Sequence, residues 1–156
     1  MYWTKNSRSG SSIRRARMDG GNRKTLISGL VDPFGITIDF PSQHLYWADE
    51  DEDKIYSSNL DGRNVQAALP LPKGAEALGI AILGDRIFWG NSGTVLLCSS
   101  TKNGSDARIE FSGIHGIAHI AAVASLKLPS GRMNHCEGRN CSKVCVLTAT
   151  SARSLE

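Results

Sequence analysis

The chain has 156 residues, with 18 lysines and arginines against 15 aspartates and glutamates, and a net charge of +3. This length suits one domain, and the mixed charges leave no basic surface of the kind that nucleic-acid-binding proteins carry. No stretch approaches the ~18 consecutive apolar residues of a membrane span. We therefore expect a folded domain that contacts neither nucleic acid nor membrane. The terminal residues 155–156 ("LE") are interpreted as a vector remnant.

A repeat of about 42 residues runs through the chain. Short β-rich segments bounded by Gly, Asp-Gly, Pro or Asn predict antiparallel strands joined by turns. No helical periodicity extends over ten residues, and four strands per repeat of this length are typical of β-propeller blades. The repeated motifs are the pairs Asp19-Gly20, Asp61-Gly62 and Asn103-Gly104, spaced 42 residues apart, and Trp3, Trp47 and Trp89, spaced 44 and 42 residues apart.

The order of these strands predicts an all-β fold over residues 1–126. With the strands of a blade named a to d, residues 2–29 give b-c-d, residues 34–71 and 78–112 each give a-b-c-d, and residues 114–125 give a single strand a. The chain thus predicts three blades, each a four-stranded antiparallel sheet, which make half of a six-bladed ring. Two copies could close this ring, since each lone strand a could complete the other copy's first blade. The alternative is a fragment that requires a missing half.

The last part of the chain has a different composition. We divide it into a linker at 127–133 and a cysteine-containing module at 134–154, while Cys98 stands alone in the repeats. Crowded cysteines indicate an oxidising compartment. Asn103 and Asn140 each begin an Asn-x-Ser sequon, which predicts N-glycosylation if the chain is secreted.

Three related motifs recur at the spacing of the repeat. They are "YWTK" at 2–5, "YWAD" at 46–49 and "FWGN" at 88–91, and each is followed later in the chain by "MDG", "LDG" or "KNG". With these motifs the chain resembles the YWTD β-propellers of low-density-lipoprotein receptors, their related receptors, pro-epidermal growth factor and nidogen. The resemblance covers about residues 1–125. Lys5 and Asn91 depart from it, because they replace the motif aspartate. The motif residues are Tyr2, Trp3, Tyr46, Trp47, Asp49, Phe88, Trp89, Asp19, Gly20, Asp61 and Gly62.

This resemblance also has implications for the tail and for the location of the protein. In that family an EGF-like module follows the propeller, and the C-x4-C-x3-C spacing of the tail resembles the first half of one. A first-to-third pairing would join Cys136 to Cys145 and leave Cys141 without its usual partner. The resemblance implies an extracellular or lumenal protein, as part of a larger, membrane-anchored receptor.

Five consecutive carboxylates, Asp49 to Asp53, follow the second motif. A metal cage or a catalytic carboxylate pair is disfavoured, because consecutive residues of a hairpin point to opposite sides and cannot converge on one ion. Two interpretations remain, a solvated loop or a docking surface for a basic partner. The resemblance implies that the loops after each motif lie on the ligand-binding face. The candidate ligand-binding residues are Glu50, Asp51, Glu52, Asp53, Asn6 and Asn91.

Histidine adds a further hypothesis, because its charge changes between pH 5 and 8. His115 and His135 are the candidates for an acid-sensitive switch. His135 beside three cysteines is not interpreted as a zinc site, because the C-x2-C spacing is missing.

The sequence therefore predicts a non-enzymatic module that needs no metal or cofactor. The first hypothesis is a protein-ligand-binding module of an endocytic receptor related to the low-density-lipoprotein receptor, with acid-dependent ligand release. The alternative is a matrix structural protein of nidogen type. A third reading, a metal-dependent six-bladed hydrolase of lactonase type, is disfavoured because the channel-lining strands offer mainly Asp39 and His119.

Overall fold

The computed structural model describes residues 1–91, 94–115, 117–122, 145–148 and 151–154 of the chain. All of the regular elements in these residues are β-strands. The strands are β1 (Tyr2–Lys5), β2 (Ser11–Arg15), β3 (Lys24–Leu30), β4 (Pro33–Asp39), β5 (His44–Asp49), β6 (Lys54–Asn59), β7 (Gln66–Pro70), β8 (Ala77–Leu83), β9 (Arg86–Asn91), β10 (Leu96–Thr101), β11 (Arg108–Ser112), β12 (Cys145–Thr148) and β13 (Ser151–Ser154).

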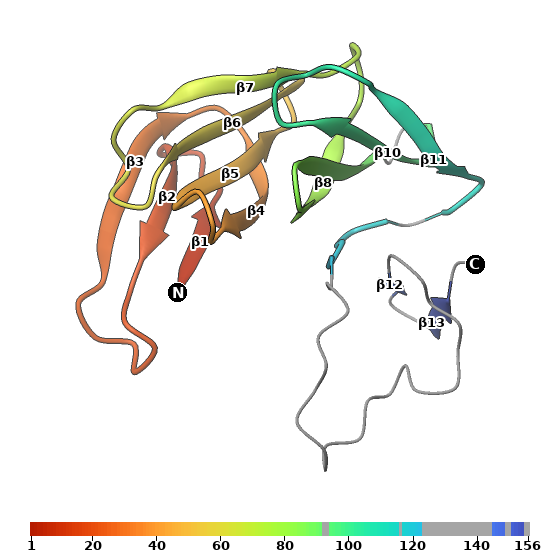
Figure 1. Cartoon of the computed structure of the whole chain (residues 1–156). Helices are drawn as coiled ribbons and strands as arrows, with labels where there is room; N and C mark the ends of the chain where they lie inside the picture. The colour runs from red at the N-terminus through yellow and green to blue at the C-terminus, as the bar shows by residue number, and fades with distance from the viewer. Residues whose placement is uncertain (92–93, 116, 123–144, 149–150, 155–156) are drawn as a thin grey trace.

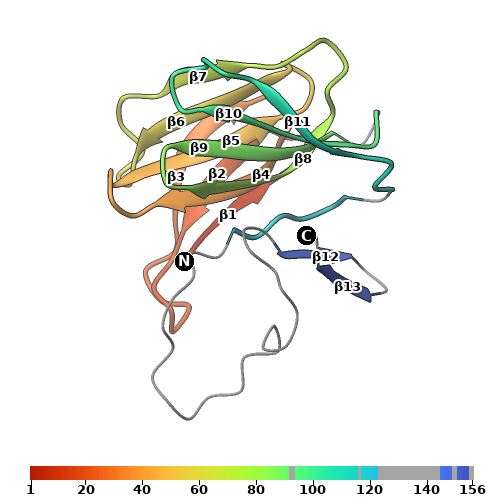
Figure 2. The same cartoon turned by 45° about the vertical axis from the view of Figure 1, so that its right-hand side comes forward.

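The first eleven strands form three antiparallel sheets that follow one another along the chain. The sheets are β1-β2-β3, β4-β5-β6-β7 and β8-β9-β10-β11, and we call them blades 1, 2 and 3. Figures 1 and 2 show the blades side by side in chain order. The predicted all-β fold of propeller blades is therefore confirmed, with three strands in blade 1 and four in each of the others. The β12-β13 hairpin forms a sheet of its own.

Two hydrophobic cores lie between the blades, and alternate side chains of β5 pack into one core or the other. Trp47 packs between blades 1 and 2, whereas Tyr46 packs with Trp89 between blades 2 and 3. Successive strand residues point to opposite faces, so the two adjacent aromatic residues of the motif fill different interfaces. Trp47 is 0 % exposed and stacks on Tyr56 with ring centroids 5.6 Å apart. Trp3, at the matching place in blade 1, is only half-buried.

The connections between strands c and d adopt the same turn in all three blades. In each turn the glycine has a left-handed φ of 80–83°, which costs glycine little. The glycine N–H also donates to a carbonyl three residues earlier, at 2.9–3.0 Å. The three donor–acceptor pairs are Gly20 with Arg17, Gly62 with Asn59 and Gly104 with Thr101.

Residues 114–115 and 117–122 occupy the position of a third strand a, next to β8. A Cβ added to Gly79 of β8 would lie 3.0 Å from the backbone of His119, and one added to Gly35 of β4 would lie 2.5 Å from the Leu78 carbonyl oxygen of β8. The predicted strand at 114–125 is only partly present, because Ala121 alone forms a bridge and residues 123–125 lie outside the described part. Strand a pairs with strand b of its own blade, and no strand b follows this segment among the described residues.

Candidate ligand-binding face

The loops between strands b and c lie at the same end of the blades as the links from one blade to the next. In blade 2, β5 ends at Asp49 opposite Pro33, the first residue of β4. The Glu50 N–H donates to the Asp32 carbonyl at 3.0 Å, so the loop at 50–53 contacts the link between blades 1 and 2. We call this end the loop face. The opposite end, with the connections at 16–23, 40–43, 60–65, 84–85 and 102–107, is the turn face.

Asp49, the first of the five carboxylates, is fully buried. Its two side-chain oxygens each accept a hydrogen bond from the Asp32 N–H at 3.2 Å. Burial raises the pKa of this carboxyl group, while hydrogen bonds from the backbone oppose the increase. Asp49 therefore fastens the link before blade 2 and offers no oxygen to a partner.

Asp53, the last of the five, fastens the link after blade 2. Its side-chain oxygens accept hydrogen bonds from Gly74 N–H at 3.0 Å and Ala75 N–H at 3.1 Å, and its carbonyl accepts one from Leu71 N–H at 2.8 Å. The residue has a positive φ of 48°, a conformation that Asp tolerates better than most residues. Asp53 is thus committed to the blade 2–blade 3 connection.

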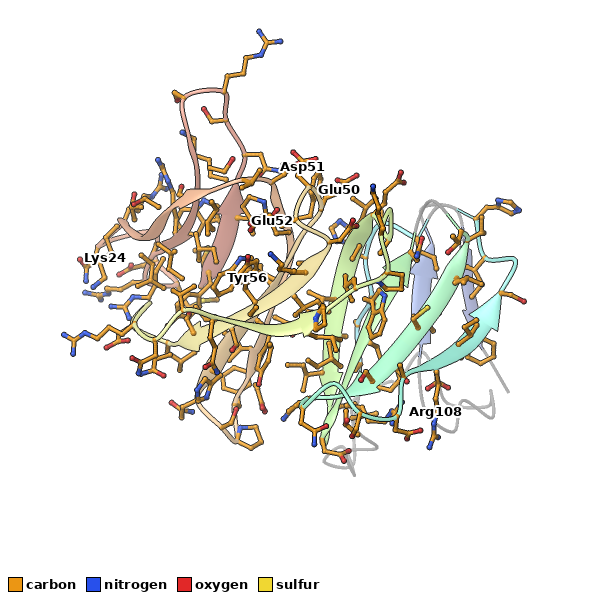
Figure 3. All side chains as sticks on the ribbon, turned by 90° about the horizontal axis from the view of Figure 1, so that it is seen from above. Lys24, Glu50, Asp51, Glu52, Tyr56 and Arg108 are labelled. Carbon is orange, nitrogen blue, oxygen red and sulfur yellow. The ribbon has the colours of Figure 1, made fainter. Side chains whose placement is uncertain are left out.

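Glu52 is also engaged within blade 2. The Tyr56 hydroxyl donates to Glu52 Oε2 at 2.7 Å, and Lys54 Nζ lies 3.9 Å from Glu52 Oε1. Burial, followed by this hydrogen bond and the charge of Glu52, raises the pKa of Tyr56 to about 12. Figure 3 shows Glu52 above Tyr56, with Glu50 and Asp51 nearby.

Glu50 and Asp51 form a cluster with two acids that the sequence analysis missed. Burial raises the pKa of Glu50, and the charges of Asp32, Glu76 and Asp51 raise it further. The pKa of Asp32 is raised by burial and then by Asp51, although a 2.6 Å hydrogen bond from the Asn6 amide opposes this. We call Asp32, Glu50, Asp51 and Glu76 the acidic patch. Asp32 and Glu76 stand at matching places, two residues before Phe34 in one repeat and two before Leu78 in the next, and this register was the signal for them.

The two asparagines of the predicted face have different positions. Asn6 is exposed on the loop face and bonds to Asp32. Asn91 is 5 % exposed, and its side-chain oxygen accepts a hydrogen bond from Thr94 N–H at 2.9 Å. This corrects the prediction that Asn91 belongs to the ligand-binding face, since the amide that replaces the motif aspartate closes its own loop instead.

The remaining predicted residues are dispersed. His115 and Asn103 are exposed. Cys98 is a free thiol buried in the core between blades 2 and 3, where burial raises its pKa. The predictions for His135, the Cys136–Cys145 disulfide, Asn140, the linker and the EGF-like module concern side chains or segments outside the described residues.

Neither a metal centre nor a membrane span is found in the part of the chain that the structure describes. No three His, Cys, Asp or Glu side chains among these residues are grouped to hold a metal ion. Asp39, the residue considered for a hydrolase site, is 2 % exposed and is paired with Lys102 and Ser42, while His119 is exposed. No helix among the described residues is long and apolar enough to cross a bilayer.

Successive antiparallel blades of three or four strands, with aromatic residues in the cores between them, define a β-propeller segment. The family model "Low-density lipoprotein receptor repeat class B" matches residues 1–40. Low-density lipoprotein receptor-related protein 5 is 28% identical in Homo sapiens and 31% identical in Mus musculus, over 94% of this chain and 9% of either relative. Protein cueball of Drosophila yakuba is 32% identical over 65% of this chain and 16% of its own length. The chain thus spans less than a fifth of these relatives.

Two solved structures also resemble this chain. A chain in a nidogen/laminin complex matches 78% of this chain and 47% of its own, with a TM-score of 0.62 and 26% identity. Regucalcin from Agrobacterium tumefaciens, titled a calcium-binding protein, matches with a TM-score of 0.66 over 79% of this chain and 45% of its own, but at 13% identity it shows the fold alone. The chain is therefore a segment of a YWTD β-propeller, and its residues 1–40 match the low-density-lipoprotein-receptor class B repeat.

Proposed function

We propose that the chain is a ligand-binding part of an extracellular receptor related to the low-density-lipoprotein receptor, and that its loop face binds a basic segment of a protein or peptide. The acidic patch carries this proposal. Burial and mutual repulsion raise the pKa of Glu50 and of Asp32, so their charges are unfavourable in the free protein. A cationic partner would reduce this repulsion, and the negative potential of the patch would attract it. The receptor-related relatives support the receptor role.

The test is binding of a fluorescent lysine-rich peptide, measured by anisotropy at low and at physiological salt. The double variant Glu50→Lys/Asp51→Lys should weaken binding by about tenfold and flatten its salt dependence, because it reverses two charges of the patch, one half-buried and one exposed. Asp85→Lys is the matched control, since Asp85 lies in an exposed connection of the turn face. Equal affinity for all three proteins would contradict the proposal.

Acid-dependent release would follow from the same patch. Carboxyl groups with raised pKa take up protons earlier as the pH falls, so affinity for the basic peptide should decrease on acidification before ordinary carboxylates titrate. Glu50→Gln should weaken binding at neutral pH and flatten this profile. The exposed His115 is the other candidate switch. A profile flattened by His115→Ala, and unchanged by Glu50→Gln, would assign release to histidine.

We also propose that further blades complete the ring and that a second copy supplies them. The half-buried Trp3 supports this, because the matching Trp47 and Trp89 are buried by the preceding blade. Analytical ultracentrifugation should then give twice the 16.8 kDa of the chain, and Trp3→Glu should reduce the mass to that of one copy. A monomer at every concentration would exclude the second copy.

A second candidate is a matrix role, which the similarity to a chain of the nidogen/laminin complex favours. In that case a laminin fragment should bind the chain, and the binding should be tested against the same charge-reversed variant. We propose binding and not catalysis, because Asp39 is already paired with Lys102. Metal-dependent turnover of a lactone would contradict this.

A further inference from the structure

The third c–d turn carries a feature that its two counterparts lack. The three turns share their backbone hydrogen bonds, and each also uses a side-chain oxygen to accept a bond from the N–H two residues later. Asp19 accepts from Gly21 at 2.9 Å, Asp61 from Arg63 at 3.0 Å, and Asn103 from Ser105 at 3.1 Å. Because two of the three turns use Asp, which has no N–H group on its side chain, the turn requires only the oxygen.

We propose that Asn103 is the attachment site of an N-linked glycan when the protein passes through the secretory route, and this inference rests on the proposed extracellular function. The Asn103 oxygen accepts bonds from Ser105 N–H, Ser105 Oγ at 2.7 Å and Thr101 Oγ1 at 2.6 Å. The Nδ2 group takes no part in these bonds. Asn103, Gly104 and Ser105 are all exposed. Among the three turns, only this one has the hydroxyl residue of a sequon, since Gly21 and Arg63 stand at the position of Ser105 in the other two.

The chemistry is compatible with the turn. Nδ2 forms a bond to the first sugar of a lipid-pyrophosphate-linked oligosaccharide, loses one proton, and the lipid pyrophosphate leaves with the electron pair of its sugar–oxygen bond. The product is still an amide, so Oδ1 continues to accept the three hydrogen bonds. The glycan therefore replaces a hydrogen atom that the folded turn does not use.

One side of the turn packs against neighbouring segments, while Asn103 and Ser105 are exposed. A Cβ on Gly104 would lie 3.3 Å from Leu69 of blade 2, Lys102 N–H donates to the Asp85 carbonyl at 2.9 Å, and Lys102 Nζ pairs with Asp39. The site lies on the turn face, at the opposite end of the blades from the acidic patch. A glycan here would cover the turn face and leave the loop face accessible to a partner.

The experiment is expression of the whole chain behind a cleavable secretory signal in animal cells. Glycopeptide mapping in 18O-water with peptide N-glycosidase then reads Asn103 separately from the second sequon at Asn140. We expect Asn103 to be occupied in the wild type and empty in Asn103→Asp and Ser105→Ala. Asn103→Asp keeps the turn oxygen, as in Asp19 and Asp61, so a loss of the glycan in this variant does not reflect a loss of the turn.

A variant that gains a sequon in a matching turn provides a positive control. Asp61→Asn/Arg63→Ser creates a sequon in the second turn and should add one glycan, whereas Asp61→Asn alone should add none. Occupancy is read in both cell-retained and secreted protein. A wild type that carries no sugar at Asn103, in cells that glycosylate the double variant, would overturn the inference without affecting the proposed ligand face. If Asn103 carries a glycan but the lysine-rich peptide does not bind, this result would contradict only the proposed function.

Discussion

Blades 1 and 2 present the same positions toward the preceding blade, but only blade 2 has that face covered. In blade 2, Trp47 lies opposite Tyr56 on the neighbouring strand, and both contribute to the core against blade 1. In blade 1 the same places hold Trp3 and Arg14, which are half-buried and belong to neither core. The Arg14 Nε is buried without a hydrogen-bond partner among the described residues. A motif tryptophan thus gains its burial from the adjacent blade and not from its own sheet.

The largest expected effect is a difference in the free energy of unfolding between the Trp47 and Trp3 variants. Trp47→Ala should reduce the free energy of unfolding by about 3–5 kcal/mol, because it leaves a cavity between blades 1 and 2. Trp3→Ala should cost less than half as much in a monomer, since Trp3 already contacts solvent. Urea denaturation of both variants measures the difference. An equal loss in both, together with a dimeric mass, would show that a second copy covers the blade 1 face.

A pair of glycines tests the same contrast without changing an aromatic residue. Gly20 and Gly62 have φ values of 80° and 83°, so alanine should cost each about 1 kcal/mol of backbone strain. A Cβ on Gly62 would also lie 2.7 Å from Leu26 Cγ and 2.8 Å from the Leu26 carbonyl oxygen of blade 1, whereas one on Gly20 would meet only Arg23 of its own turn. Gly62→Ala should therefore lose about 1–3 kcal/mol more. Similar losses would mean that the turn itself, and not the neighbouring blade, decides the cost.

A smaller effect concerns the polar contact between blades 2 and 3. Lys102→Met should destabilise the protein by about 2 kcal/mol at neutral pH, because it leaves the buried Asp39 carboxylate without its cation. Burial alone would raise the pKa of Asp39, but Lys102 and Ser42 lower it below its usual 3.8. This stabilisation is therefore complete above that usual pKa and is lost as the pH falls through the lower folded value.

The measurement for Lys102 is unfolding free energy against pH for the wild type, Lys102→Met and Lys102→Arg. The wild type and Lys102→Met should converge at acid pH, and Lys102→Arg should retain most of the stability because it keeps the charge. A constant difference across the pH range would show that Lys102 acts by packing its aliphatic chain.

Much of the fold was predictable because two independent spacings agreed. The spacing of Trp3, Trp47 and Trp89 and the spacing of the Asp-Gly and Asn-Gly turns placed the strands in three blades. The end of the last segment was not predictable in the same way. Its residues have the composition of strand a, but a strand also requires a hydrogen-bonding neighbour, and that partner is not specified by the segment itself.

The candidate site was only partly predictable. The loop at 50–53 was expected on the ligand-binding face, but the sequence did not separate the structural acids Asp49 and Asp53 from the displayed acids Glu50 and Asp51. The difference depends on backbone N–H groups about 20 residues away, which any residue type can supply. The burial of Asn91 has the same origin, since its partner is the backbone of Thr94.

The two structural carboxylates have a consequence for the thermodynamics of recognition. Asp49 and Asp53 hold both ends of the loop at 50–53, each by hydrogen bonds to a different inter-blade link. The loop is therefore ordered before a partner arrives, and Glu50 and Asp51 lose little conformational entropy on binding. Replacing Asp53 would consequently weaken affinity by loosening the loop, even though its carboxylate contacts only the protein itself.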